Sequence, residues 1–453
     1  MERNLGMGAR RRLAGMMLML VLAACQGPAA PAGVPTGTVA GEGDQATRAL
    51  HTDTAPAPVE LTPTEAGLSA TATKGPLATG AASSPSSTAA PEAGAWQLPQ
   101  VKSLTVVAGP GERVYLLAGS GHDLHLHRSD DGGQTFRPPV LVSAGSQAEV
   151  LGVVRPALDR RPDGALSAAW VETSTGGQSQ VRATLSTDGG QTFSEPATIA
   201  STSDPETTMA TVKFTEAGSV VVTWLQDSTL RLAVSAADGL TFGPPVVIDD
   251  LVCECCQPQP LATGDALYVA YRNLVEDPTG QVRDIHVAAS RDGGAHFSAP
   301  VPVSEASWHI NACPIAGPEL AVAGSTLYAA WMDGRFDDGT FSRTDIWLAS
   351  STDGGASFGA NVRVNDVEGN YNGQPAMTLD RLSRLHVAWT ADTAEGPAIL
   401  YTESTDKGAT FAPSRTVVSG MGRLGSPVLA ASEVGRVYLA WTDADGGYLN
   451  VIE

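Results

Sequence analysis

Seven short segments of alternating small and bulky apolar residues recur along the chain, and six of them end in an aromatic residue. They are VYLLAG (residues 114–119) and SAAW, VVTW, YVAY, YAAW, HVAW and YLAW, which end at Trp170, Trp224, Tyr271, Trp331, Trp389 and Trp441. Such short apolar segments are typical of strands buried between two sheets. The pattern therefore predicts seven repeated strand units and an all-β fold.

A polar motif of eight residues follows the first six segments. Its copies are SDDGGQTF, STDGGQTF, SAADGLTF, SRDGGAHF, STDGGASF and STDKGATF, which begin at Ser129, Ser186, Ser235, Ser290, Ser351 and Ser404. The intervals between these serines are 57, 49, 55, 61 and 53 residues. A period of this length built from short strands predicts a β-propeller, in which each repeat forms one small sheet.

Each copy of the motif is expected to form a tight turn. In five copies the third residue is Asp, whose carboxylate can accept hydrogen bonds from backbone N–H groups just ahead of it. The glycine two positions later allows a positive φ, and the closing Phe can be buried between sheets. The third copy departs from the pattern, because Ala237 stands where the carboxylate belongs and Asp238 comes one residue late. We expect that turn to be the loosest.

The motif resembles the Asp box, or bacterial neuraminidase repeat, of sialidases and of many propellers that are not enzymes. Five copies in register make the resemblance specific, and it covers roughly residues 96–453. The resemblance implies that the aspartates are structural, on the face of the propeller away from the active site, and that they neither catalyse a reaction nor bind calcium. Sialidases that share the box have six blades.

The seven strand units nevertheless favour seven blades of four strands, with six as the alternative. The last unit (residues 426–453) supplies three strands and stops where its own turn motif would begin. Residues 96–103, WQLPQVKS, look like the segments that follow the motif elsewhere, such as FSAPVPVS and FGPPVVID. We therefore predict that they provide the missing fourth strand and close the ring, which removes exposed sheet edges.

Residues 1–25 are typical of a bacterial secretory leader. Four arginines (Arg3, Arg10, Arg11 and Arg12) precede an apolar stretch from Leu13 to Leu22 that is too short to span a membrane. The sequence from Leu22 to Cys25 resembles a lipobox, which implies cleavage before Cys25, lipidation of that residue and attachment to a membrane surface. The alternative is an ordinary secreted protein with a chance cysteine. Either interpretation places the protein outside the cytoplasm.

Residues 26–95 are rich in Ala, Pro, Thr, Ser and Gly, and no Phe, Trp or Tyr precedes Trp96. A segment of this composition cannot bury enough apolar surface to offset the entropy lost on ordering. We therefore expect a disordered linker between the lipid anchor and a single propeller domain over residues 96–453.

The charge of the chain argues against a nucleic-acid partner. Residues 1–95 hold 6 basic and 7 acidic residues of the 28 and 48 in the chain, which leaves 22 and 41 in the propeller, a formal net charge of −19. Nucleic-acid binding depends on basic residues that neutralise phosphates. Acidity at this level favours solubility and says little about the fold.

Four cysteines remain besides Cys25, in two segments. Cys253, Cys255 and Cys256 occur in VCECCQPQP, and Cys313 occurs in WHINACPIAGPEL. Both segments fall at joins between blades, on the face opposite the turn motifs, so the four thiols could converge near the channel mouth beside Trp308 and His309.

Two interpretations of this cluster are open. Two disulfides would suit an oxidising compartment. Alternatively, the four thiolates, with His309 as a further ligand, could bind a metal ion, and such sites suit Zn²⁺ or Cu(I). A cysteine nucleophile is the weakest idea, because the sequence supplies no orienting base and third group.

Sialidase chemistry would need arginines for a substrate carboxylate, an acid/base carboxylate, and a Tyr nucleophile paired with Glu. Candidates on the expected face are Arg155, Arg272, Arg335 and Arg423, the carboxylates Asp333 and Glu319, and the tyrosines Tyr271 and Tyr371. The Arg-Ile-Pro segment typical of sialidases is absent, and the polar residues of this face are largely acidic. Solvated surface loops would explain the same residues.

Two functional hypotheses follow. The first is a surface-anchored binding propeller whose ligand is a glycan, a protein or a metal ion. The second is an exo-α-sialidase-type glycoside hydrolase, and a purely structural propeller is a third possibility. Turnover of a sialoside would separate the enzyme from the binding module, since fold alone does not determine function.

Overall fold

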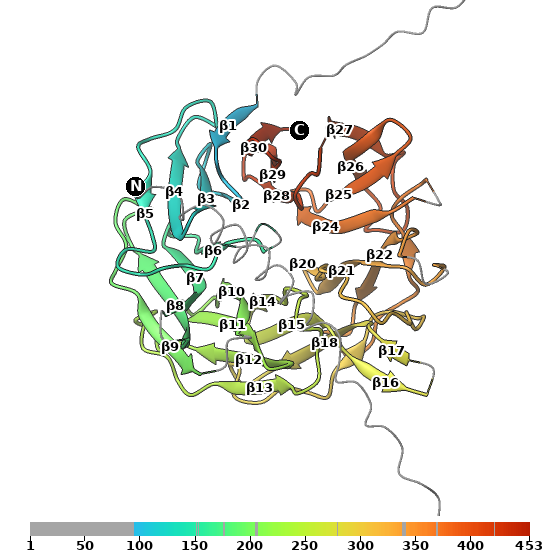
Figure 1. Cartoon of the computed structure of the whole chain (residues 1–453), viewed down its shortest axis with the longest axis horizontal. Coiled ribbons are helices and arrows are strands. Elements are labelled where there is room, and N and C mark those ends of the chain that lie inside the picture. The colour runs from blue at the N-terminus through green and yellow to red at the C-terminus, as the bar shows by residue number, and fades with distance from the viewer. Residues whose placement is uncertain are drawn as a thin grey trace, which may run out of the picture. The chain divides into compact units, whose positions relative to one another are not determined.

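The computed structural model describes residues 95–453 except 151, 153, 175–176, 204–206, 279, 338–340, 368–369 and 421. Within this part of the chain every regular element is a strand, and seven four-stranded antiparallel sheets form the blades of a β-propeller (Figure 1). The prediction of seven blades is confirmed, and the alternative of six is excluded. The predicted leader lies outside the described residues, as does the linker up to residue 94. No helix that could cross a membrane occurs among the described residues.

Each of blades 1 to 6 is a simple meander in which the first strand lies at the ring centre. Blade 1 comprises β2 (Ser103–Ala108), β3 (Val114–Ser120), β4 (Asp123–Ser129) and β5 (Val140–Leu141); blade 2, β6 (Ala157–Arg160), β7 (Leu166–Thr173), β8 (Ser179–Ser186) and β9 (Ala197–Thr202); blade 3, β10 (Thr208–Phe214), β11 (Val220–Gln226), β12 (Thr229–Val234) and β13 (Val246–Asp249). Blade 4 comprises β14 (Gln259–Thr263), β15 (Ala266–Arg272), β18 (Ile285–Ser290) and β19 (Val301–Pro302); blade 5, β20 (Glu319–Ala323), β21 (Thr326–Asp333), β22 (Asp345–Ser351) and β23 (Val362–Arg363); blade 6, β24 (Asn372–Leu379), β25 (Leu385–Thr393), β26 (Gly396–Ser404) and β27 (Arg415–Ser419). A separate hairpin of β16 (Val275–Asp277) and β17 (Gly280–Val282) interrupts blade 4.

Blade 7 joins the two ends of the described chain. It contains β28 (Val428–Ala431), β29 (Val437–Thr442) and β30 (Gly446–Val451), and its outermost strand is β1 (Trp96–Pro99). Strand β1 runs antiparallel to β30, with Trp96 opposite Leu449 and Pro99 opposite Gly446. The prediction that the segment 96–103 closes the ring is confirmed for Trp96–Pro99, whereas Ser103 at its end already begins β2 of blade 1.

The core consists of layers of apolar side chains between neighbouring blades. The aromatic residues predicted from the repeat lie in the second strand of blades 2 to 7, and Trp224, Trp331 and Trp389 are completely buried there. Trp224, for example, packs between blades 2 and 3 among apolar residues of both sheets. Small residues alternate with these rings along the strand because successive side chains point to opposite faces of the sheet, and each face packs against a different neighbouring blade.

Five of the six polar motifs form one repeated hydrogen-bonded turn. In the first, Ser129 Oγ donates to Asp131 Oδ1 over 2.7 Å and accepts from the backbone N–H of Gly133 over 2.8 Å. The same carboxylate accepts the backbone N–H of Thr135 over 2.9 Å and its hydroxyl over 2.5 Å. The carboxylates of these turns are therefore fully used in holding the turn between the third and fourth strands.

The third motif replaces part of this network. Asp238 Oδ1 accepts the backbone N–H groups of Leu240 and Thr241, both over 2.9 Å. The serine of this copy, Ser235, donates to the carbonyl of Ala236 over 2.8 Å instead of to a carboxylate. Asp238 thus accepts the backbone N–H groups of the turn from a position one residue later than in the other copies, but it accepts no hydrogen bond from the serine. That this turn is looser than the others stays a prediction.

The turn carboxylates predict a loss of stability in acid. Hydrogen bonds from Thr135 to Asp131, from Ser357 to Asp353 and from Thr410 to Asp406 each lower the aspartate's pKa from 3.8 to about 2. Because the folded-state pKa is depressed, the stabilisation is complete above about pH 4 and is lost as the pH falls towards 2. We expect the urea midpoint to fall steeply over that interval. Asp353→Ala should lower the midpoint at pH 7 and flatten this fall, and an unchanged slope would contradict the assignment.

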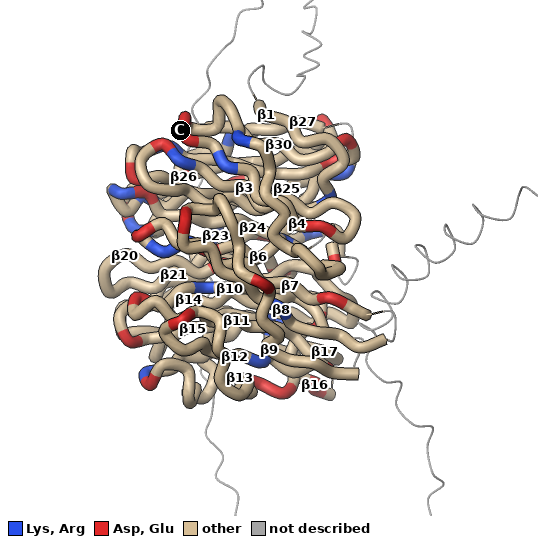
Figure 2. Tube along the Cα trace, turned by 90° about the vertical axis from the view of Figure 1, so that its left-hand side faces the viewer, with Lys and Arg blue, Asp and Glu red and all other residues tan. Residues whose placement is uncertain are grey.

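Acidic and basic residues are interspersed along the blades on the side of the ring shown in Figure 2. Neither sign of charge forms one continuous patch there. This distribution, with a formal net charge of −20 for the whole chain, gives a polyanion no favourable surface on that side.

Candidate functional site

Three long connections of the ring lie on one face, at blades 4 and 5. The β16–β17 hairpin lies between the second and third strands of blade 4, the join to blade 5 covers residues 303–318, and residues 334–344 link β21 to β22. Because successive strands are antiparallel, these connections leave the blades at the edge opposite the serine–aspartate turns. These three connections therefore offer loop residues on this face that could bind a ligand.

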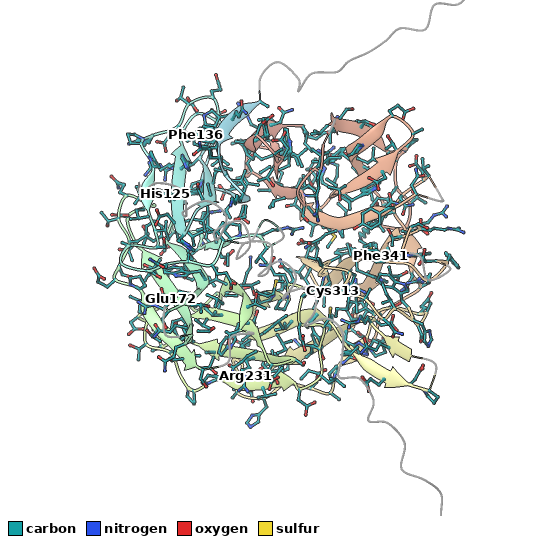
Figure 3. The ribbon with its side chains drawn as sticks, in the orientation of Figure 1. His125, Phe136, Glu172, Arg231, Cys313 and Phe341 are labelled. Carbon is teal, nitrogen blue, oxygen red and sulfur yellow. A yellow bond between two sulfur atoms is a disulfide. The ribbon has the colours of Figure 1, made fainter. Side chains whose placement is uncertain are left out.

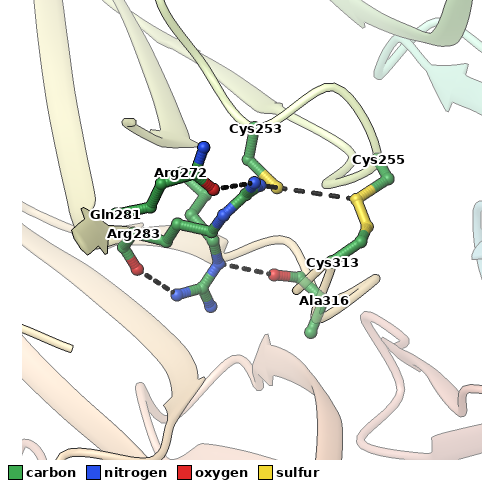
Figure 4. Close-up of a disulfide and its surroundings, with 7 residues drawn as sticks. All are labelled: Cys253, Cys255, Arg272, Gln281, Arg283, Cys313 and Ala316. Carbon is green, nitrogen blue, oxygen red and sulfur yellow. Dashed lines mark hydrogen bonds between the residues drawn. A yellow bond between two sulfur atoms is a disulfide. The ribbon is translucent and has the colours of Figure 1, made fainter. Parts of the chain in front are cut away.

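The propeller's four cysteines lie together on this face. Cys255 and Cys313 form a disulfide that joins the connection between blades 3 and 4 to the connection between blades 4 and 5, with their Cα atoms 6.4 Å apart (Figure 4). Cys253 and Cys256 are free thiols, each 1% exposed. The Sγ atoms of Cys253, Cys255 and Cys256 lie within 4.8 Å of one another. Figure 3 shows Cys313 close to the centre of the ring.

The two cysteine-bearing connections pack tightly against each other. A Cβ atom at Gly317 would lie 2.0 Å from the carbonyl oxygen of Gln257, so only glycine fits there. The side chain of Gln257 in turn donates to the carbonyl of Arg155 over 3.0 Å. Three inter-blade connections are therefore locked together around the disulfide.

Positive charge surrounds the free thiols. Arg283 Nη1 donates to Cys253 Sγ over 3.2 Å, and this Sγ lies 3.6 Å from that of Cys255. Burial alone would raise the pKa of Cys253, but a hydrogen bond from Cys256 and the charges of Arg283 and Arg272 lower it to about 6. Burial and the neighbouring Cys253 raise the pKa of Cys256. The two free thiols therefore differ in how readily each ionises.

His309 does not belong to this cluster in the structure. Its Nε2 lies 2.9 Å from Asp277 Oδ2, on the hairpin of blade 4, and 43% of its side chain is exposed. The hydrogen bond to Asp277 raises the pKa of His309. Among the described residues, the only group of three or more candidate ligands with all ligand atoms within 4.8 Å comprises the three cysteines of the VCECC segment.

Arg272 is buried, with 1% of its surface exposed, and all three of its described hydrogen bonds go to backbone carbonyls. Its Nε donates to Ala316 over 3.1 Å, Nη1 to Arg283 over 2.7 Å and Nη2 to Met332 over 2.7 Å. The guanidinium also lies 5.3 Å from the ring centroid of Trp308. Arg272 thus ties blade 4 to blade 5 and cannot meet a substrate carboxylate in this arrangement.

Arg335 and Asp333 form a buried ion pair at the end of β21. Arg335 donates to both oxygens of Asp333, over 2.9 Å from Nε and 2.6 Å from Nη2, and its guanidinium stacks 4.0 Å from the ring of Trp347. Asp333 also accepts the indole N–H of Trp331 over 2.8 Å. The bidentate pair satisfies both side chains, so neither is poised to act on a substrate.

Arg155 reaches across the channel mouth to the other side of the ring. It forms an ion pair with Glu319 on β20, and its Nη2 donates to the carbonyl of Pro375 on β24 over 2.8 Å. Burial raises the pKa of Glu319, although the charge of Arg155 opposes that rise. The arginine and carboxylate that sequence analysis proposed for catalysis are therefore brought together, but as partners of each other.

The cavities beside Arg155 are small. One holds about 30 Å³, lined in part by Arg155, Trp170 and Glu149, and a second holds about 10 Å³ beside Trp441. Burial raises the pKa of Glu149, a half-buried carboxyl that sequence analysis did not single out. A volume of 30 Å³ admits about one or two waters, whereas pockets that enclose a small ligand measure roughly 300–1,000 Å³.

The two candidate tyrosines differ in their surroundings. Tyr271 is 1% exposed and donates to Asp249 Oδ2 over 2.6 Å, and burial together with that carboxylate raises its pKa. Tyr371 is half-buried, and burial also raises its pKa, with Asp392 reinforcing the rise and Arg423 opposing it. Both phenols are therefore protonated at neutral pH, and Tyr371 alone is accessible.

Tyr371 is part of an aromatic group that sequence analysis missed. Its ring centroid lies 5.6 Å from that of Phe341, which stacks on the buried Trp308 at 5.7 Å with an interplanar angle of 8°. Phe336, on the same loop as Phe341, is 55% exposed and lies 6.1 Å from Trp347. We use the name aromatic surface for the exposed Phe336 together with the half-buried Phe341 and Tyr371; Figure 3 shows Phe341 on the blade 5 side of the ring.

Phe341 in this loop has a strained backbone conformation. Phe341 has a φ of 58°, which is uncommon for a bulky residue. Asp337 stabilises the turn, because its carboxylate accepts the backbone N–H groups of Phe341 over 2.7 Å and of Ser342 and Arg343 over 3.1 Å. Aromatic residues in a long, Asp-rich loop (DGRFDDGTFSRTD) were the signal available in the sequence.

Comparison with known proteins extends the fold assignment. No protein-family model and no curated protein matches the chain. The solved structure of an ulvan lyase of polysaccharide lyase family PL25 has a TM-score of 0.55 at 11% identity, with 79% of this chain and 95% of that chain covered. A PL25 ulvan lyase bound to -[GlcA(1-4)Rha3S]- gives a TM-score of 0.53 at the same identity and coverage. A Hadza microbial sialidase, Hz136, gives 0.43 at 14% identity, covering 77% of this chain and 64% of that chain. At 11% identity the likeness to the two ulvan lyase structures shows a shared fold alone.

Proposed function

We propose that this protein is an extracytoplasmic propeller of the Asp-box group, anchored to a membrane through lipid on Cys25, that binds a glycan at the aromatic surface. The observation that carries the proposal is the loop of blade 5, which exposes Phe336 and holds Phe341 at a positive φ on the carboxylate of Asp337. Strained backbone of this kind is retained where the surrounding structure enforces it, often at ligand-binding positions.

The composition of this region suits an oligosaccharide. Tyr371 and Phe341 offer ring edges and faces against which the apolar face of a sugar can pack, and the exposed Asp392 and Arg423 lie near enough to Tyr371 to affect its pKa. Ligand sites commonly combine aromatic walls with a few polar groups that fix orientation. The ulvan lyase of similar fold was solved with -[GlcA(1-4)Rha3S]- bound, which supports a glycan as the ligand class.

The state of the candidate catalytic groups favours binding over hydrolysis. Arg272 is bonded to three carbonyls, Arg335 is paired with Asp333, and Arg155 is paired with Glu319. Of the four arginines named from the sequence, Arg423 alone is exposed among the described residues. A sialidase requires several arginines that converge on the substrate carboxylate, so we rank the exo-α-sialidase interpretation second.

The glycan proposal predicts a local loss of affinity from one exposed ring. The full chain would be screened on an array of neutral, uronic-acid-containing and sialylated oligosaccharides, and the best binder titrated by calorimetry. Phe336→Ala should weaken binding about tenfold, or ~1.4 kcal/mol, because truncating an anchoring aromatic commonly costs more than 1 kcal/mol. Leu382→Ala is the matched control, since Leu382 is 63% exposed on the turn between β24 and β25, at the opposite face.

A fluorogenic sialoside panel tests the alternative with the same preparations. We expect no turnover. Turnover that Arg423→Ala or Tyr371→Phe abolishes would support the glycosidase and overturn the binding proposal. Equal glycan affinity in the native protein, Phe336→Ala and Leu382→Ala would also refute binding at the aromatic surface.

A further inference from the structure

Two buried thiols remain available after the disulfide is formed. Cys253 and Cys256 stand three residues apart in a turn in which the backbone N–H of Cys256 donates to the carbonyl of Cys253 over 3.3 Å. Their Sγ atoms lie within 4.8 Å of each other, and both residues are 1% exposed. The aromatic surface uses neither thiol, and neither thiol contributes to the disulfide.

The surroundings of the pair favour negative charge. Arg283 donates to Cys253 Sγ over 3.2 Å, and the neighbouring Arg272 is buried with only neutral carbonyls as hydrogen-bond partners among the described residues (Figure 4). A buried charge is costly unless other charges or hydrogen bonds compensate it. Thiolate sulfur beside these guanidinium groups would supply that compensation.

We propose that Cys253 and Cys256 form a two-thiolate site for a soft monovalent metal ion, Cu(I). The disulfide already uses Cys255 and Cys313, and His309 points to Asp277, so the described residues around the two thiols do not supply the four ligands that structural Zn²⁺ requires. Thiolate ligands select Cu(I), and two suffice for it. Binding replaces two thiol protons by one Cu⁺, leaving a site of net charge −1 beside two arginines, with no change of oxidation state.

Cu(I) titration of the full chain tests this site. The detergent-solubilised protein, purified without oxygen, would be titrated with Cu(I) against bicinchoninate, and its mass recorded natively and after denaturation without reductant. We expect one copper per chain with one disulfide intact. Cys253→Ala and Cys256→Ala should each abolish stoichiometric binding, whereas His309→Ala should leave the affinity unchanged.

A further variant, which keeps both thiols, distinguishes loss of the metal site from misfolding caused by the alanine substitutions. Arg283→Gln should weaken Cu(I) binding roughly 10- to 100-fold, the usual effect of removing a group that supports a metal ligand. The proposal is overturned by a denatured mass showing two disulfides, by copper binding that survives both alanine substitutions, or by retention of Zn²⁺ in preference to Cu(I). Glycan affinity is measured in parallel and should not respond to copper, so failure here is distinguishable from failure of the proposed function.

Discussion

A chain that begins at Val101 is expected to lose the closed ring, whereas a chain that begins at Ala95 should retain it. The six residues that differ include β1, whose pairing with β30 completes blade 7. Its Trp96 also stacks on Phe136, with ring centroids 3.8 Å apart. Trp96 is half-buried, so its side chain contributes part of the roughly 3–5 kcal/mol that loss of a core Trp costs, and the four residue pairs between β1 and β30 are lost as well. We therefore expect the melting temperature to fall by roughly 10 °C or more.

The exposed edge should also change the behaviour of the protein in solution. Without β1, strand β30 presents unpaired N–H and C=O groups, and such edges promote association. Size-exclusion chromatography should therefore show oligomers of the shorter chain. The variant Trp96→Ala, made in the chain that begins at Ala95, distinguishes the contribution of the Trp96 side chain from that of strand β1. Its melting temperature should lie between those of the chains that begin at Ala95 and at Val101. Identical melting of all three would show that ring closure contributes nothing.

The blades and their turns could be predicted because their causes are local. The Ser129–Asp131–Thr135 network spans seven residues, so a short motif contains every donor and acceptor that it needs. Ring closure was also predictable, since residues near Trp96 resemble the outer strand of other blades and the last unit lacks one. The count of seven strand units led to a prediction of seven blades, although the resemblance to sialidases suggests six.

The cysteines show where such prediction stops. Topology placed Cys255 and Cys313 at neighbouring joins, but four cysteines allow three pairings, and the spacing of 58 residues does not choose among them. The choice depends on how two irregular connections pack, down to the contact between Gly317 and the carbonyl of Gln257. Sequence analysis left two disulfides and a metal site open, whereas the structure holds one disulfide and two free thiols.

The arginines illustrate the same limit for function. Arg272 receives its partners from positions 11, 44 and 60 residues away, in three different segments. Nothing in its immediate sequence distinguishes a guanidinium bound to carbonyls from one that awaits a substrate. The aromatic surface was missed for a different reason: Phe336 and Phe341 lie outside every repeat, and only the length and Asp content of their loop marked them in the sequence.

Removing the disulfide should be the second large effect. Cys255→Ala with Cys313→Ala opens a covalent loop of 58 residues, and the entropy of such a loop in the unfolded chain corresponds to about 4 kcal/mol. We expect the free energy of unfolding in urea to fall by about that amount, beyond the effect of the lost side-chain volume, and the melting temperature to fall by roughly 5–10 °C.

The matched control removes the other two sulfurs of the same cluster. Cys253→Ala with Cys256→Ala deletes two buried thiols but leaves the covalent loop closed, so it should cost about 1 kcal/mol per site through small cavities and about 1 kcal/mol for the hydrogen bond that Arg283 loses. The difference between the two double variants then measures the covalent link itself. Equal losses would mean that the cluster stabilises the joins by packing alone. A larger loss from the Cys253 and Cys256 pair would mean that these two thiols, and whatever they bind, hold blades 4 and 5 together.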